Sequence, residues 1–415
     1  MKTLKALVAK YNAASLILRI LVGLLVGVVL ALVVPGAGWV EEFGNLFVGA
    51  LKGIAPVLVF VIVASALAQG TSKLDRRFGT VIWLYMLTTF LAAAIAVITS
   101  FLFPQTIVLA EAAESEVVPQ GLGEVLSTLL TNFVANPISA LLNGNYIGIL
   151  FWACLFGLAM KKYGAESTKV FLANTADAVS QIVRWIINLA PFGIMGLVYT
   201  NVVNNGLSIF TQYGRLLALL VGTMLFMALV VSPFIIFLYL HCNPYPLVFR
   251  CLRESGLTAF FTRSSAANIP VNMALCEKLD LDKDMYSVSI PLGATINMDG
   301  AAITIMTLAA ANTLGLQVSL PAAILLSVMS ALGACGASGV AGGSLLLIPM
   351  ACSLFGISND IAMQVVGVGF IIGVVQDSVE TALNSAGDVE FAATAEYHQW
   401  HKAGKPLPEF LGGKK

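Results

Sequence analysis

Acidic and amide side chains interrupt an apolar stretch near the C-terminal end of the sequence. Residues 361–391 contain five polar residues at helical spacing: Asp377, Glu380, Thr381, Asn384 and Asp388. At about 100° per residue, a helix places all five within an arc of about 100°. A solvent-facing stripe is the usual explanation, but residues 361–375 are too apolar for a soluble surface helix. Because no basic residue lies between Pro349 and Asp388, we expect sodium ions and a substrate ammonium group to balance the acids.

A second interruption lies in residues 290–301, which read IPLGATINMDGA. Asn297, Asp299 and Gly300 break an apolar helix there, and a carboxylate at the centre of a membrane helix costs about 2.5–3.5 kcal/mol, so it is normally partnered and functional. Gly293 and Gly300 let the backbone unwind, and unwound carbonyls with Asn and Asp oxygens form a cage that suits a small alkali cation. The alternative is that Asp299 only caps a broken helix.

A third group of oxygens occurs in residues 83–89, WLYMLTT. Tyr85, Thr88 and Thr89 would lie on one side of an apolar helix. On its own this pattern is a weak indication of a site, because Thr in membrane helices often bonds its own backbone.

Two short, broken segments must position these side chains. Residues 257–276, LTAFFTRSSAANIPVNMALC, and residues 321–352, PAAILLSVMSALGACGASGVAGGSLLLIPMAC, each have two apolar arms around a polar or Gly-rich centre. Each pattern predicts a helical hairpin that enters the membrane and turns back. Such tips are tolerated only in protein or beside a cavity, and a pair of them points to a transporter's binding site. The alternative is two loops that join ordinary helices.

The composition places the whole chain in a membrane. Of 415 residues, 58% are hydrophobic and 11% charged, against about 25% charged in soluble domains. Apolar stretches long enough to predict spans recur at residues 15–34, 46–68, 81–103, 146–160, 182–203 and 216–240. The first is too long for a secretory leader and lacks a cleavage site, so we expect a retained helix. A net charge of zero argues against a nucleic-acid partner.

Charge distribution predicts the topology. Basic residues cluster at 2–10, 73–77, 161–162, 250–253 and 402–415, whereas Glu41, Glu42 and residues 111–124 are acidic. Because Lys and Arg mark cytoplasmic loops, we expect both termini in the cytoplasm and an even number of crossings. The six cysteines show no CxxC pairing and the three histidines no metal-ligand spacing. These patterns favour neither a zinc site nor an intramembrane enzyme.

The segments RSSAANIP, PLGATINMDG, the Gly-rich second hairpin and D-x-x-E-T-x-x-N-x-x-x-D resemble the glutamate-transporter superfamily of dicarboxylate/amino acid:cation symporters. The likeness spans nearly the whole chain and is greatest to the serine/threonine:sodium symporters of bacteria. It implies sodium-coupled import of serine and threonine across the inner membrane.

The resemblance implies an all-α membrane fold of eight transmembrane helices and two re-entrant hairpins, assembled in lipid as a homotrimer with an elevator mechanism. Residues 1–77 would form scaffold helices 1 and 2, and residues 106–210 scaffold helices 4 and 5. Residues 78–105 would be helix 3 of the moving transport domain. Residues 211–396 would be the rest of that domain, and residues 397–415 a cytoplasmic tail.

The resemblance also implies the site residues. The substrate residues would be Arg263, Ser264, Ser265, Val340, Asp377, Glu380, Thr381 and Asn384. Ser265 and hairpin backbone near Arg263 and Val340 would receive the α-carboxylate, and Asp377 would bind the α-ammonium group. One sodium set would be Gly293, Asn297, Asn384 and Asp388. Another would be Tyr85, Thr88, Thr89, Asn297 and Asp299. A third would use backbone near Thr295, Ala334, Cys335 and Ala337, beneath the second hairpin, which would act as the gate.

Two departures bear on specificity. Acidic-substrate members carry an arginine where this chain has Glu380, and a hydroxyl residue where it has Ala301. We expect Glu380 to repel a second carboxylate and to accept a hydrogen bond from a substrate hydroxyl. Ala334 and Ala337 stand where the family has a serine or threonine, which leaves the number of sodium sites open. A proton-coupled carrier, a carrier of acidic amino acids or dicarboxylates, and an ion channel remain alternatives.

Overall fold

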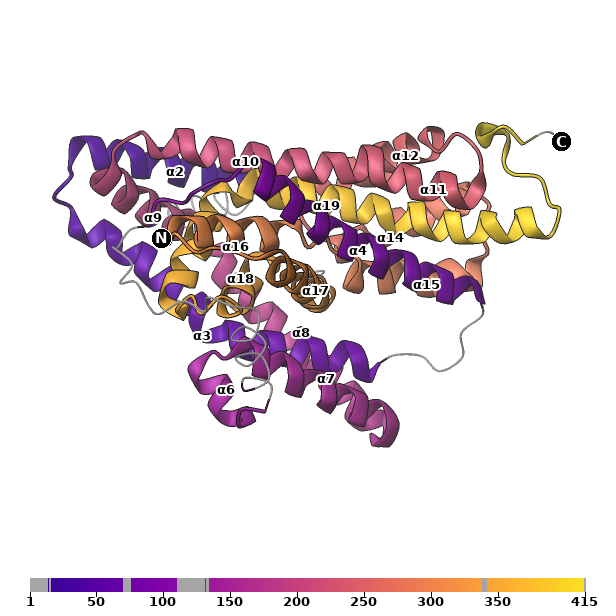
Figure 1. Ribbon diagram of the computed structural model, residues 1–415, viewed down its shortest axis with the longest axis horizontal. Coiled ribbons are helices and arrows are strands. Elements are labelled where there is room, and N and C mark those ends of the chain that lie inside the picture. Colours follow the sequence, from indigo (N-terminus) through magenta and orange to yellow (C-terminus); the bar gives the residue numbers. More distant parts are fainter. Residues whose placement is uncertain are drawn as a thin grey trace, which may run out of the picture.

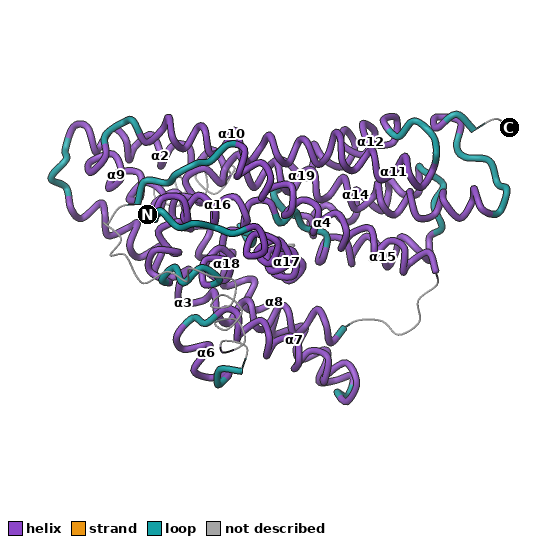
Figure 2. Tube along the Cα trace, viewed as in Figure 1, coloured by secondary structure: helices purple, strands orange, loops and turns teal. Residues whose placement is uncertain are grey.

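The computed structural model describes residues 14, 16–69, 76–109, 131, 134–337 and 342–413. These residues form helices joined by turns, and no strand occurs among them (Figure 2). The longer α-helices are α2 (Leu16–Val33), α3 (Gly38–Ala68), α4 (Arg76–Leu102), α7 (Tyr146–Tyr163), α8 (Glu166–Asn188), α9 (Ala190–Asn205), α10 (Ile209–Phe226), α14 (Ser265–Lys278), α15 (Lys283–Ile296), α16 (Ala301–Thr313), α17 (Leu320–Ala337) and α19 (Asn359–Lys402). The predicted all-helical class is confirmed for this part of the chain.

Short helices complete the fold. They are α6 (Pro137–Asn143), α11 (Ser232–Leu240), α12 (Tyr245–Cys251), α13 (Leu257–Thr262), α18 (Ile348–Ser353), the π-helices η1 (Met227–Val231) and η2 (Leu252–Gly256), and the 3-10 helices η3 (Leu345–Leu347) and η4 (Glu409–Leu411).

Five helical stretches of the described chain are long and apolar enough to cross a membrane. They are Gly38–Ser65, Arg77–Leu102, Ile209–Leu240, Lys283–Thr313 and Asn359–Lys402. A bent pair, Glu166–Asn188 with Ala190–Asn204, would make a sixth span. The chain is therefore a multi-pass membrane protein, as its composition predicts.

The bent pair covers one predicted span. The apolar stretch over residues 182–203 contains a bend, because α8 and α9 meet at an angle of 53°. Pro191 lies in the first turn of α9. A proline there has no N–H for an intrahelical bond and its ring clashes with the carbonyl four residues earlier, which favours a bend between α8 and α9.

The helices pack in two groups (Figure 1). In the first, α3 packs against α7, α8 and α9, and α2 packs against α9. The helices approach closely where Gly44 faces Gly196, since a Cβ at Gly196 would lie 2.4 Å from the Gly44 nitrogen. In the second, α4 packs against α15, α16 and α17, while α19 contacts α13, α14, α15 and α18. The polar residues singled out in the sequence all belong to this second group.

The first predicted hairpin is two helices that meet at a tight tip. α13 ends at Thr262, Arg263 adopts a left-handed conformation (φ 51°), and α14 begins at Ser265. The Ser264 side chain caps α14 by accepting a hydrogen bond from the Ala267 nitrogen at 3.2 Å. The first arm of this hairpin, before the tip, is longer than predicted, because α12 and η2 extend it back to Tyr245. In the second hairpin, α17 forms one arm and η3 with α18 the other, and residues 338–341 between them lie outside the described chain.

α19 is longer than the sequence predicts. It runs unbroken for 44 residues from Asn359 to Lys402, about 66 Å at 1.5 Å per residue, whereas the hydrocarbon core of a bilayer is about 30 Å thick. The helix thus passes the expected start of the tail at residue 397. Beyond it the chain folds back, and the Lys405 ammonium lies 3.2 Å from the centre of the Trp400 ring.

Candidate functional site

The candidate site lies where α19 meets both hairpins and the break between α15 and α16. Asn297 to Gly300 separate those two helices without helical structure, as the sequence predicts. Every predicted α19 residue that forms a hydrogen bond or ion pair has at least one partner on these neighbouring elements. The site therefore combines segments that are far apart in the sequence.

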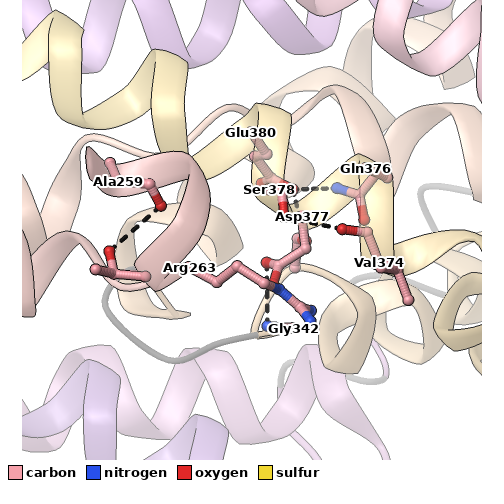
Figure 3. A network of polar contacts seen from close by, with 10 residues as sticks. Ala259, Arg263, Gly342, Val374, Gln376, Asp377, Ser378 and Glu380 are labelled. Carbon is pink, nitrogen blue, oxygen red and sulfur yellow. Dashed lines mark hydrogen bonds and ion pairs between the residues drawn. The ribbon is translucent and has the colours of Figure 1, made fainter. Parts of the chain in front are cut away.

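Asp377 joins the tips of the two hairpins (Figure 3). Its Oδ2 accepts from Arg263 Nε at 2.7 Å and lies 2.6 Å from Arg263 Nη2, while its Oδ1 accepts from the Gly342 nitrogen at 3.2 Å. Both charged side chains are buried, with 8% of Arg263 and 4% of Asp377 exposed. Removal of one partner from a buried ion pair is costly, because it leaves an uncompensated buried charge.

The ion pair corrects one expectation about charge. The sequence predicts that ions and substrate supply the positive charge for α19, and assigns only hairpin backbone near Arg263 to the site. In the structure the Arg263 side chain itself supplies one positive charge. Sequence spacing gives no indication of this, because 114 residues separate Arg263 from Asp377.

Glu380 lies one turn beyond Asp377 on α19 and is 1% exposed. Its Oε2 accepts from the Gln376 amide (Figure 3). The same oxygen accepts from Ser344 Oγ at 3.1 Å. Its Oε1 is buried without a hydrogen-bond partner among the described residues. Thr381 is buried beside it. Glu380 therefore keeps one acceptor oxygen available.

Asp388 is the centre of a second cluster. Asn297 Nδ2 donates to its Oδ1 at 2.9 Å, and the Tyr85 hydroxyl donates to its backbone oxygen at 2.9 Å. Asp388 Oδ2 is buried without a partner among the described residues. A Cβ added at Gly293 would lie 2.6 Å from Asp388 Oδ1 and 2.9 Å from the Tyr85 oxygen. Only glycine permits this approach, which leaves a carboxylate oxygen in an oxygen-rich place suited to an alkali cation.

Asp299 connects that cluster to α16. Its Oδ1 accepts from the Ala301 nitrogen at 2.7 Å, so it does cap the broken helix. Its own nitrogen donates to Asn384 Oδ1 at 3.0 Å. Asp299 also lines a cavity together with Thr88, Thr89, Asn297 and Asn384. The capping role and a role in ion binding are thus compatible.

The two threonines of α4 bond to their own helix. Thr88 Oγ1 donates to the Leu84 oxygen and Thr89 Oγ1 to the Tyr85 oxygen, both at 2.8 Å. These are the backbone bonds that the sequence pattern alone predicts. They use each hydroxyl hydrogen and leave oxygen lone pairs to face the cavity.

The remaining predicted residues are less closely connected. Ser265 is buried at the start of α14. The Thr295 hydroxyl donates to the Leu292 oxygen at 2.7 Å, and Cys335 Sγ lies 3.5 Å from Met86 Sδ. Ala334 and Ala337 belong to α17, which packs against α15. Val340 lies outside the described residues.

Sequence reasoning missed a buried polar network that holds the first hairpin to α19. Asn268 Nδ2 donates to Ser385 Oγ at 2.8 Å, Asn272 Nδ2 to the Ser385 oxygen at 3.0 Å, and Ser255 Oγ to Asn272 Oδ1 at 2.5 Å. All four residues are fully buried. The sequence feature that could have indicated this network is the pair of asparagines, four residues apart, in the apolar second arm of the first hairpin. Ser344 and Gln376 were missed as well.

These features define a class: a helical membrane protein with buried carboxylates and broken helices at bilayer depth is a membrane transporter. The chain matches the sodium:dicarboxylate symporter family over residues 16–397 and belongs to that family. This confirms the resemblance seen in the sequence, and it confirms a transporter rather than an enzyme.

Curated relatives narrow the comparison. The chain is 75% identical over 416 residues to a serine/threonine transporter of Bifidobacterium adolescentis, with 100% of this chain and 97% of the relative covered. It is 58% identical over 396 residues to a serine/threonine transporter of Streptococcus agalactiae, covering 95% and 98%. A serine/threonine transporter of Streptococcus thermophilus is 55% identical over 403 residues, covering 96% and 100%.

Proposed function

We propose that this protein imports serine and threonine by symport with sodium ions across the cell's inner membrane, with both termini in the cytoplasm. Family membership and full-length relatives that are serine/threonine transporters support the proposal. The observation that carries it is a buried charge imbalance. Among the buried residues described, Arg263 is the one base, against the acids Asp299, Asp377, Glu380, Asp388, Glu390 and Glu396.

The substrate would bind between the hairpin tips and α19. Its α-ammonium group would take the place of the Arg263 guanidinium at Asp377, the one carboxylate of the site that already holds a cation. Its α-carboxylate would lie at the start of α14, near Ser264 and Ser265, where backbone N–H groups and the helix dipole favour an anion. Thr381 and Asn384 would complete the pocket. The side-chain hydroxyl would donate to the free oxygen of Glu380.

Sodium would enter as cargo. Asp388 Oδ2 and the oxygens around Gly293, Asn297 and Asn384 would hold one ion, because this buried carboxylate oxygen has no protein partner among the described residues. A second ion would lie near Tyr85, Thr88, Thr89, Asn297 and Asp299, and a third beneath the second hairpin, near Thr295, Ala334, Cys335 and Ala337. The second hairpin would act as the gate over the substrate.

Coupling follows from neutralisation. A closed gate over a zwitterion and several carboxylates leaves a negative site unless cations enter too. Sodium and substrate then strengthen each other's binding by equal factors, because linkage is reciprocal. Each net positive charge that crosses adds about 2.3 kcal/mol per 100 mV. We propose further that the second helix group moves as an elevator against the first, within a homotrimer.

Serine uptake into reconstituted vesicles tests the proposal. We expect an inward sodium gradient to drive accumulation of labelled serine above its external concentration, and potassium or choline to give none. A pH gradient in sodium-free medium serves as the second arm. Accumulation driven by that pH gradient would support the proton-coupled alternative instead, and current without saturable serine exchange would support a channel.

A further inference from the structure

A cavity with a mixed polar and apolar lining lies beside the candidate sodium residues, on the side where α4 and α19 face the π-helix η1. Its polar lining includes Thr88, Asp299 and Asn384 of the site already described, and also Ser232 and Glu390, which belong to none of the sequence-predicted sets. No basic residue lines it. The cavity therefore extends the carboxylate-rich site toward a group of residues without an assigned role.

Glu390 is the charged side chain of this extension. It is 4% exposed, and its carboxylate forms no hydrogen bond or ion pair with any described residue. Leaving a buried carboxylate unpaired is costly, so such a side chain is normally matched by a partner. The cavity that it lines is where a partner could be supplied.

Ser232 adds a second oxygen to the lining of the cavity. The side chain is 8% exposed and has no hydrogen-bond partner among the residues described. It directly follows η1, whose residue Met227 also lines the cavity. A π-helix inserts one extra residue into a helical turn and is frequent at functional sites. Here it shapes the wall that carries the hydroxyl.

The chemistry of the lining selects the ligand. Two carboxylates, three hydroxyls and two amides, with no base, favour a cation over an anion. In the described ranges, no group of three or more His, Cys, Asp or Glu side chains is placed to hold a metal ion together. Calcium takes six to eight oxygens and magnesium a near-ideal octahedron. Two acids and a few neutral oxygens are better matched to one monovalent ion that keeps some of its water.

We propose that this cavity is an additional sodium-binding position, with Glu390 as its charged ligand and Ser232 as a neutral one, adjoining the ion near Asp299 and Thr88. The inference rests on the proposed sodium coupling and deepens it. An ion at this position would neutralise a buried acid of α19 that neither the substrate nor the sequence-predicted sodium sets reach and that, unlike Glu396, accepts no hydrogen bond from a described residue.

The test measures sodium binding in the absence of serine. Purified protein is titrated with sodium chloride at constant ionic strength, with choline as the replacement ion, and thermal stabilisation gives the sodium midpoint. We expect Glu390→Gln to raise that midpoint roughly 10- to 100-fold and to lower the number of sodium ions carried per serine by one, measured with labelled sodium and serine.

Glu396→Gln is the matched control. It makes the same change on the same helix, but Glu396 lies outside the cavity and accepts from the Asp282 nitrogen instead. A Glu390→Gln protein indistinguishable from this control in midpoint and stoichiometry would overturn the inference. So would magnesium or calcium stabilising the wild type at lower concentration than sodium in a Glu390-dependent way.

Ser232→Ala keeps the inference testable if Glu390→Gln does not fold. We expect it to raise the sodium midpoint roughly two- to tenfold, the effect of one neutral ligand, and an unchanged midpoint would count against the site. If sodium fails to stabilise the wild type at all, the proposed sodium coupling itself is refuted, and the two failures are distinguishable.

Discussion

Glu380 presents one occupied and one free oxygen to the space between α19 and the second hairpin. Ser344 and Gln376 hold Oε2, and Oε1 has no partner among the residues described. A free carboxylate oxygen accepts a hydrogen bond from a hydroxyl and repels a second carboxylate. This arrangement is what a carrier of hydroxyl amino acids requires.

We expect Glu380→Arg to reverse this preference. Serine uptake should fall roughly 10- to 100-fold, because a hydrogen bond to a charged group is lost, and aspartate uptake should appear, because a guanidinium pairs with a second carboxylate. Competition between labelled serine and unlabelled aspartate measures both effects. Retained serine preference with no gain for aspartate would contradict the role given to Glu380.

Arg263 supplies a different prediction, since it compensates Asp377 when no substrate is present. Arg263→Met should destabilise the substrate-free protein by about 3–5 kcal/mol, the cost of leaving one partner of a buried ion pair. Because the substrate ammonium group would replace the lost charge, serine should stabilise this variant more than the wild type. Thermal unfolding with and without serine measures the difference, and Arg263→Lys, which keeps the charge, is the control. Equal stabilisation by serine in both proteins would contradict the exchange.

At the scale of elements, the site depends on how closely α15 approaches α19. Gly293→Ala would place a methyl group 2.6 Å from Asp388 Oδ1, and the helices would have to separate. We expect a loss of about 1–3 kcal/mol in stability and weaker sodium binding in the same thermal titration. Gly222→Ala on α10 is the control, because a Cβ there meets nothing within 4 Å. Similar behaviour of the two variants would refute the close contact.

The first hairpin also carries an ion pair outside the membrane spans. Lys278 Nζ lies 2.9 Å from Glu254 Oε2, and this hydrogen bond lowers the pKa of Glu254 below its ordinary value of 4.5. A group with a lowered folded pKa stabilises the fold above its unfolded pKa and loses that contribution as the pH falls through the folded pKa.

We therefore expect wild-type stability to decline as the pH falls below 4.5, and Lys278→Met to flatten part of that decline. The pair is partly exposed, so its contribution is at most about 1 kcal/mol. Melting temperatures of both proteins between neutral pH and strong acid measure the difference. Parallel curves would show that the pair contributes nothing.

The sequence could predict two features of this fold: the helical periodicity of polar residues and the positions where helices break. The polar face of α19, the break at residues 297–300 and the tip at Arg263 follow from spacing and from turn residues. The angle between α8 and α9 was missed because hydropathy continues through Leu189. Glu390 was missed because, at about 220° from Asp377 on the helix, it lies off the predicted polar face.

Contacts between distant segments could not be predicted in the same way. The Arg263–Asp377 pair and the Asn272–Ser385 bond join residues more than a hundred positions apart. Helical periodicity gives the direction of a side chain from its own helix, but not which other helix faces it. The family resemblance predicted which segments form the site, and the packing of the helices showed which side chains contact each other.

At the scale of the whole molecule, Lys52 of α3 forms an ion pair with Asp360 at the start of α19, and so joins the two helix groups. If the groups move past each other, this contact must break in every cycle. Paired cysteines at these positions, joined by a short thiol-reactive linker, should abolish serine uptake, and a cleavable linker should restore it on reduction. The single-cysteine variants and the wild type, treated alike, are controls. Undiminished uptake by the linked protein would exclude relative motion of the groups.

The unbroken length of α19 has a practical consequence. One continuous helix, α19, carries the site residues and also Lys402; the site residues are Asp377, Glu380, Asn384 and Asp388. This helix is roughly twice as long as the bilayer core is thick. Because α19 is continuous, we expect a displacement of the binding pocket along the helix axis to move the Lys402 end of the helix by the same distance. A fluorophore attached at the Lys402 end would therefore measure this displacement in single molecules without contacting the binding pocket.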